Sequence, residues 1–318
     1  MMNRNYWLDG IMGLVAGDAL GCPVQFHSRE EIALNPVRGM RGHGTFDMPA
    51  GTWTDDSSMA LAALVSILEH GSIDPDDIMA KFISWKNDGA YTPFGFAFDE
   101  GATCTYAIWN YQIGHDWRTC GKTGEHANGN GALMRILPVC LYCYEKQQAG
   151  QMSDTEVIEK VHQIAGLTHN HLRSHIACGL YYFMIRAILN REGSLLNRLQ
   201  EGIDDGFGFY EKDALNHEQL EYYKRIRNIT DFIKTPSKEI RSSGYVVASM
   251  EAALWSLGNT RSFADALLTA VNLGDDSDTV AAIAGGLAGL YYGYEGIPAE
   301  WLDVIQRREW IEQLCRRI

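Results

Sequence analysis

The stretch NLGDDSDTVAAIAGGLAG, residues 272–289, places three aspartates and a threonine directly before a run of small apolar residues. The polar residues are Asp275, Asp276, Asp278 and Thr279. The start of a helix leaves N–H groups free and carries the positive end of the helix dipole, so negative charge is favoured there. One acidic side chain is enough to cap a helix. The cluster therefore indicates either a helix cap with more acidic residues than capping requires or a cation site.

The same helix carries small residues at Ala281, Ala282, Gly285 and Gly289. Small side chains let the backbones of two helices approach closely. We therefore expect a neighbouring helix to pack tightly here and to hold the acidic loops in register.

A second stretch repeats this chemistry far upstream. Residues 51–58, GTWTDDSS, set Thr54, Asp55 and Asp56 directly before the apolar run MALAALVSILEH. We predict a helix here, capped by Thr54 or Asp55 and ended by Gly71. Carboxylate and hydroxyl oxygens are hard ligands that suit Mg²⁺ or Mn²⁺ and not Zn²⁺. If both stretches face one cleft, we expect two metal ions, roughly 3.5–4 Å apart, that orient hydroxyls and a water for hydrolysis.

The remaining sequence is patterned for helices, because apolar residues recur with the helical period and few period-2 segments lie between turn residues. A capping box at Ser153 begins a helix that runs towards Gly166, and Thr168 opens a longer apolar helix. Pro23 restricts the residue before it, so we expect residues 22–26 to be extended. A final amphipathic helix is predicted from Trp301.

No internal repeat or linker divides the chain. We therefore predict an all-α fold, a single compact multi-helix domain over residues 1–318. Residues 191–241 are more polar than the rest and are predicted to be a peripheral insertion.

Composition limits the classes of function. A net charge of −13 argues against a nucleic-acid binder, which needs a basic surface. No apolar run of membrane length occurs, and Asp9 and Asp18 interrupt the apolar N-terminal segment, so we expect neither a membrane span nor a signal peptide. Seven cysteines without framework spacing are typical of reduced thiols, and we expect a cytoplasmic protein.

Other catalytic patterns are weak. His171 and His175 are four residues apart, but no metalloprotease glutamate accompanies them, so we favour a structural role for both. His169 lies in the loop before the helix and is the better candidate for a substrate contact. Cys140 and Cys143 form a single CxxC that is best explained by core packing. No Walker loop and no nucleophile elbow occurs.

Taken together, five motifs resemble the ordered motif series of the ADP-ribosylglycohydrolase family, which includes the dinitrogen-reductase-activating glycohydrolases. The resemblance extends from about residue 9 to about residue 293. The motifs are GLVAGDALGCPVQF at 13–26, GTWTDDSSMAL at 51–61, GNGALMRILPV at 129–139, the Thr168-His169 pair and the stretch at 272–289. The resemblance implies an all-helical fold, two Mg²⁺ or Mn²⁺ ions, and hydrolysis of the glycosidic bond that joins ADP-ribose to a protein side chain, in several members an arginine.

The resemblance also implies roles for individual residues. The implied metal ligands are Thr54, Asp55, Asp56, Asp276, Asp278 and Thr279, while Asp275 stands where many relatives have glycine. Asp99 matches an acidic position implicated in catalysis, to which we add Asp55 and Asp278. The implied substrate-binding residues are Asn128, Gly129, Asn130, Gly131, His169 and Gln25.

Gln25 is the main departure from the family pattern, which has glutamate at this position. A neutral amide can coordinate through its oxygen but adds no charge, so we expect weaker binding of the second ion. We predict an enzyme that acts on ADP-ribosyl-arginine in proteins and releases ADP-ribose. Two alternatives stay open: a weakened ADP-ribose-binding antagonist of an ADP-ribosyltransferase toxin, and a dinuclear-metal nucleotide phosphohydrolase.

Overall fold

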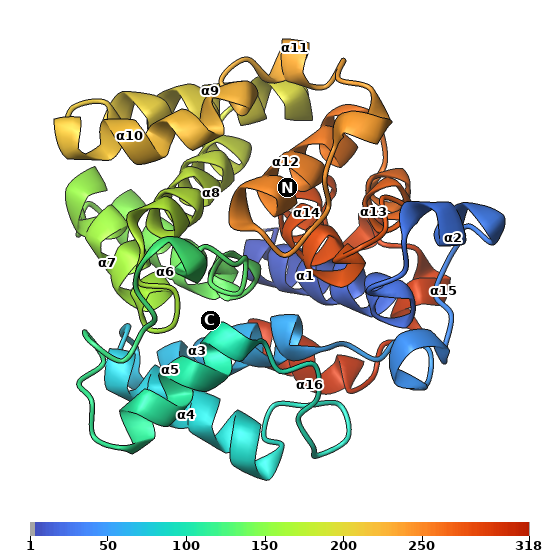
Figure 1. Ribbon diagram of the computed structural model, residues 1–318, viewed down its shortest axis with the longest axis horizontal. Helices are drawn as coiled ribbons and strands as arrows, with labels where there is room; N and C mark the ends of the chain where they lie inside the picture. Colours follow the sequence, from blue (N-terminus) through green and yellow to red (C-terminus); the bar gives the residue numbers. More distant parts are fainter. Residues whose placement is uncertain (1–3, 318) are drawn as a thin grey trace.

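Two helices from opposite ends of the chain form the centre of the molecule. In the computed structural model, which describes residues 4–317, α1 (Tyr6–Gly21) lies against α14 (Ser277–Tyr292), and the other helices surround this pair (Figure 1). Residues 4–317 contain no β-strand, and their buried apolar side chains join into one core. The predicted all-α fold is confirmed.

The remaining α-helices, in chain order, are α2 (Arg29–Leu34), α3 (Asp55–His70), α4 (Pro75–Asp88), α5 (Ala102–Gln112), α6 (Leu137–Gln148), α7 (Asp154–Gly166), α8 (Leu172–Asn190), α9 (Leu195–Tyr210), α10 (His217–Leu220), α11 (Ile229–Phe232), α12 (Val246–Gly258), α13 (Phe263–Val271), α15 (Ala299–Leu302) and α16 (Arg308–Cys315). Short 3₁₀ turns join several of them, among them η1 (Cys22–Val24), η2 (Gly44–Phe46) and η4 (Leu133–Arg135).

Glycines bring α1 and α14 into backbone contact. A Cβ at Gly285 would overlap the carbonyl oxygen of Gly13, so a side chain at this position would force the helices apart. The facing pairs are Gly13 with Gly285, Gly17 with Ala281, and Gly21 with Asp278. The close approach expected from Gly285 is thus confirmed, and its partner is α1, whose C-terminal end meets the first turn of α14.

Helix α3 begins and ends where the sequence indicates. Thr54 caps its N-terminus by accepting a hydrogen bond from the Asp56 amide, and Gly71 ends it with a φ of 64°. Such a left-handed residue at the end of a helix is usually a glycine because no Cβ obstructs it. The first turn of α3 is fully buried, which is unusual for a helix start that carries two carboxylates.

Two predictions about local structure are wrong. Cys22 is not extended before Pro23 but has φ −45° and ψ −45°, and its amide donates to the Asp18 carbonyl at the end of α1. The contact of Gly21 with the start of α14 imposes this turn, and the preference of a residue before proline is too weak to oppose it. The last amphipathic helix begins at Arg308, not at Trp301, because the chain turns at Arg307, whose φ is 53°.

The segment 191–241 lies on one side of the molecule. Its main helix, α9, packs along α8, and the short helices α10 and α11 follow it at the edge of the structure (Figure 1). Leu199, Ile203 and Phe207 on α9 are buried, so the segment also contributes to the core. That it is an insertion stays a prediction. Within residues 4–317, none of the helices has the length and apolar character needed to cross a membrane.

Candidate functional site

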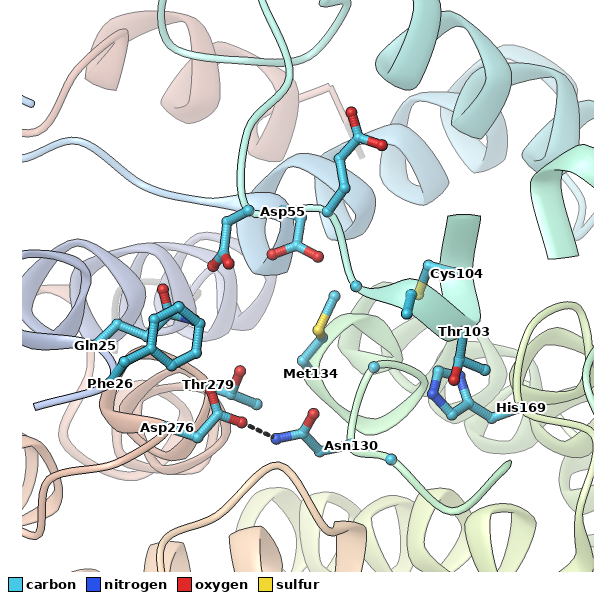
Figure 2. Close-up of a pocket in the computed structure, with 16 residues that line it drawn as sticks. Gln25, Phe26, Asp55, Thr103, Cys104, Asn130, Met134, His169, Asp276 and Thr279 are labelled. Atoms are coloured by element: carbon cyan, nitrogen blue, oxygen red, sulfur yellow. Dashed lines mark hydrogen bonds between the residues drawn. The ribbon is translucent and has the colours of Figure 1, made fainter. Parts of the chain in front are cut away.

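The starts of α3, α5 and α14 meet the loop Gly129–Gly131 and His169, which precedes α8, around one cavity of about 290 Å³ (Figure 2). Nine of the residues singled out from the sequence line it: Gln25, Asp55, Asp99, Gly129, Asn130, Gly131, His169, Asp276 and Thr279. Segments up to about 250 residues apart in sequence thus converge, which only the tertiary structure could show.

The two acidic clusters are in direct contact. The Thr279 hydroxyl donates to Oδ1 of Asp56 at 3.2 Å, which joins the first turn of α14 to the first turn of α3. Asp56 and Asp278 are completely buried beneath the cavity lining, while Asp55 and Asp276 face the cavity. The expectation that both clusters share one cleft is therefore met by the geometry.

Several oxygens in this cluster lack a hydrogen-bond donor. They are Oε1 of Gln25, Oδ2 of Asp56, and both Oδ1 and Oδ2 of Asp278, all shielded from solvent. A buried carboxylate without a partner costs several kcal/mol, at least about 3, so such groups are normally paired or bound to a metal. These unpaired atoms are all oxygens, the ligand type that Mg²⁺ and Mn²⁺ prefer.

The carboxyl groups repel one another strongly. Burial, followed by the charges of neighbouring aspartates, raises the pKa of Asp55, Asp56 and Asp278 well above the ordinary value. Burial also raises the pKa of Asp99 to about 6, although a hydrogen bond from Gln25 acts in the opposite direction. A bound divalent cation would relieve this repulsion by stabilising the charged forms.

Asp18 is a site residue that the sequence reasoning missed. One carboxylate oxygen of Asp18, one of Asp56 and one of Asp278 all lie within 4.8 Å of one another. However, Asp18 accepts hydrogen bonds from the amides of Thr54 and Ser57, each at 2.9 Å, and from the Ser57 hydroxyl at 2.6 Å. Most of these bonds go to Oδ2, and together they anchor the first turn of α3. The signal was available, because an aspartate amid the apolar residues of α1 needs a buried partner.

The loop before η4 forms another wall. Asn130 donates from its amide nitrogen to Oδ2 of Asp276 at 2.5 Å and to the Ser249 hydroxyl at 2.9 Å, so it ties this loop to α14 and α12 (Figure 2). Arg135, itself buried, donates to the Gly131 carbonyl and holds the loop from below.

His169 lies against the same loop. A Cβ at Gly131 would lie 2.8 Å from Cε1 of the His169 ring, so only glycine fits there. Burial, and next the Arg135 charge, lower the pKa of His169 to about 3, which keeps the ring neutral. Its Nδ1 is hydrogen bonded to the Thr168 hydroxyl at 2.8 Å.

Besides Asp56 and Asp278, two expected residues, Thr54 and Asn128, do not line the cavity. Thr54 is buried as the cap of α3, and the Asn128 side chain donates to the Glu125 carbonyl at 2.9 Å. Asp275 is exposed and has a φ of 60°, a conformation that asparagine, aspartate and glycine tolerate best.

Comparisons with known proteins agree with this geometry. The sequence model of a family described as ADP-ribosylglycohydrolase matches residues 4–318. The chain is 32% identical to the ADP-ribosylarginine hydrolase Tri1 of Serratia proteamaculans (strain 568), over 97% of this chain and 77% of that protein. It is also 32% identical to the ADP-ribosyl-(dinitrogen reductase) glycohydrolase of Rhodospirillum rubrum, over 98% and 92% of the two chains. A solved structure described as an ADP-ribosylglycohydrolase-related protein complex superposes with a TM-score of 0.76 at 29% identity, covering 98% of this chain and 96% of that one.

Proposed function

The chain belongs to the ADP-ribosylglycohydrolase family and is an enzyme that hydrolyses glycosidic bonds of ADP-ribose, and from this premise we propose that it releases ADP-ribose from arginine side chains of proteins with the help of two divalent cations. The arginine linkage is supported by a relative that is named an ADP-ribosylarginine hydrolase.

The observation that carries the metal part of the proposal is the set of buried oxygens without donors on Gln25, Asp56 and Asp278. Their chemistry is that of a hard-cation site, and two acidic helix starts provide enough oxygens for two ions. The ligands would be Thr54, Asp55, Asp56, Asp276, Asp278 and Thr279. Bound cations would supply positive charge that orients the ribose hydroxyls and lowers the pKa of a water.

The protein residues would bind the substrate and move the proton. The glycines of the loop Gly129–Gly131 let its backbone approach the pyrophosphate closely, and neutral His169 would contact a ribose. Asp99 lines the cavity, and without bound cations its pKa is raised to about 6, so its carboxyl is placed to take up or give a proton there. It would act as the general acid or base while the anomeric carbon passes through an oxocarbenium-like state.

The test measures free ADP-ribose released from ADP-ribosyl-arginine, first after chelation of metals and then after addition of Mg²⁺ or Mn²⁺. We expect release only with metal, and a loss of at least about 100-fold in Asp278→Asn. Asp275→Asn is the matched control, because it removes a neighbouring charge that faces solvent, and it should retain activity. Absence of ADP-ribose at every metal concentration would refute the proposal.

The same experiment separates the alternatives. Release of phosphate from nucleotides without glycosidic cleavage would identify a phosphohydrolase. An ADP-ribosyltransferase toxin as partner stays a prediction, and protection against such a toxin that survives in Asp278→Ala would support an antagonist that works by binding. No specific observation favours either alternative over glycohydrolysis.

A further inference from the structure

Five phenylalanines from three separate segments form a continuous row beside the cavity. We call this row the phenylalanine ridge; its members are Phe26, Phe46, Phe98, Phe96 and Phe94. Consecutive ring centroids lie 6.4, 5.2, 6.3 and 6.3 Å apart, within the range of direct aromatic contact. The row therefore acts as one surface.

The ridge is unusually exposed. Phe26 is 63% exposed, Phe96 46% and Phe94 40%. Single exposed apolar residues are normal, but a contiguous apolar patch on a soluble protein usually marks an interaction site. The ridge is such a patch, because its exposed members are linked through the partly buried rings of Phe46 and Phe98.

The ridge begins at the cavity. Phe26 lines the cavity next to Gln25 (Figure 2), and Phe98 directly precedes Asp99, which lines it as well. One end of the ridge thus borders the cavity. A polypeptide whose modified side chain enters the cavity beside Phe26 would lie against the ridge.

The ridge is also held in place. Phe26 has a φ of 68°, an uncommon conformation for a bulky residue, and its amide donates to the Asp275 carbonyl at 2.7 Å. Backbone strain of this kind persists only where surrounding contacts enforce it, and it concentrates at functional sites. The Thr45 hydroxyl donates to the Gln25 carbonyl at 2.6 Å and so fixes the segment of Phe46 to that of Phe26.

The third segment has its own supports. The Gly95 amide donates to the Thr92 hydroxyl at 2.9 Å, and Arg307 donates to the Thr92 carbonyl at 2.8 Å. These bonds close the loop that carries Phe94 and Phe96 and fasten it to the turn before α16. A surface that is already rigid loses little conformational entropy when a partner binds.

We propose that the phenylalanine ridge is the docking surface for the polypeptide of an ADP-ribosylated protein substrate, where it takes apolar residues that flank the modified side chain. This inference rests on the proposed function, since it concerns what is attached to the ADP-ribose in the same cavity. A membrane is a poor occupant, because a chain with a net charge of −13 is repelled by an anionic lipid surface. A second copy of the chain on the ridge would lie over Phe26 beside the cavity and would compete with substrate.

The test compares three substrates: ADP-ribosyl-arginine, a 13-residue peptide ADP-ribosylated on a central arginine with leucines on both sides, and the same peptide with serines instead. In the unaltered protein we expect kcat/KM for the leucine peptide to exceed that for the serine peptide by roughly tenfold. The double variant Phe94→Ser, Phe96→Ser should lose this preference and cleave ADP-ribosyl-arginine within about twofold of the unaltered rate. The control Leu34→Ser, Leu215→Ser removes two side chains that are 88% and 80% exposed elsewhere and should retain the preference.

Three outcomes would overturn the inference: no preference for leucine in the unaltered protein, an equal loss on ADP-ribosyl-arginine and on both peptides, or a self-association of the unaltered protein that the double ridge variant abolishes. Failure of the proposed function would look different, because the unaltered protein would then cleave none of the three substrates.

Discussion

At the scale of single residues, we expect Gln25 to influence how strongly the proposed second cation is held. Its Oε1 is buried without a hydrogen-bond donor, so the amide oxygen is available as a ligand. It also lies among carboxylates that repel one another, and a neutral amide adds no further repulsion there. Compared with a glutamate, the amide would therefore destabilise the metal-free protein less and would bind a cation less strongly.

Gln25→Glu should therefore raise the affinity for Mn²⁺ by about tenfold, because a charged ligand replaces a neutral one. The measurement is calorimetric titration of the metal-free protein. Gln148→Glu adds the same charge on the surface, at the end of α6, and should leave the affinity unchanged. Equal affinities of Gln25→Glu and the unaltered protein would show that this side chain does not contact the cation.

Asp18→Asn should destabilise the protein by about 1–3 kcal/mol and also weaken metal binding. The amide nitrogen of asparagine is a donor, and it would replace a carboxylate oxygen that accepts a hydrogen bond from the first turn of α3. Thermal unfolding and metal titration measure the two effects. Asp9→Asn is the control: Asp9 lies on the same helix and accepts from Arg4 and from the Tyr294 amide at the other end. It should lower stability and leave metal affinity intact; a similar loss of affinity in both variants would contradict the anchoring role of Asp18.

At the scale of elements, the packing of α1 on α14 sets the geometry of the cleft. Their backbones touch along a row of glycines and alanines, and this contact ends where Gly21 meets Asp278. The 3₁₀ turn η1 follows Gly21 directly and leads to Gln25. Asp278 on α14 and Gln25 after α1, both proposed to contact cations, are thus placed by one helix pair.

Gly285→Leu should separate the two helices and reduce stability by about 3 kcal/mol, and it should also weaken metal binding although no ligand is altered. Thermal unfolding and metal titration again provide the measurements. Gly208→Leu is the matched control, since a Cβ at Gly208 on α9 would have no neighbour within 4 Å, and it should leave both quantities nearly unchanged. Unchanged metal affinity in Gly285→Leu would disprove the link between helix packing and the site.

At the scale of the whole molecule, the buried acids make stability depend on pH and on metal together. The folded, metal-free chain raises the pKa of Asp18 and of Asp99 to about 6 from the ordinary 3.8. Between these values the folded state holds protons that the unfolded state has released. The free energy of unfolding therefore falls as pH rises from about 4 to about 6, by about 1.4 kcal/mol per unit for each group at most.

A divalent cation should reverse this loss, because it binds the charged carboxylates of the folded state only. We expect Mg²⁺ or Mn²⁺ to raise Tm more at pH 8 than at pH 5, where protons compete for the same oxygens. Thermal unfolding with metal and with chelator at both pH values checks this. Asp278→Asn should lose most of the metal-dependent rise, and an equal rise at pH 5 and pH 8 in the unaltered protein would contradict the expectation.

The sequence by itself determined where many helices begin and which side chains could hold a cation. Thr54, Gly71 and Ser153 are local signals, since a cap or a stop depends on groups within a few residues, and the structure confirms each of them. The acidic starts of α3 and α14 were visible for the same reason, and the motif order was enough to indicate the family.

Only the tertiary structure decided what these signals do together. The Thr279 hydroxyl donates a hydrogen bond to Asp56, and Asp18 accepts hydrogen bonds that anchor α3. Cys22 has a helical conformation and not the extended one expected before Pro23. The tertiary structure also assembled the phenylalanine ridge from three distant segments. Each of these depends on contacts between residues far apart in the chain, whose energies come from burial and close packing and leave no periodic trace in the sequence.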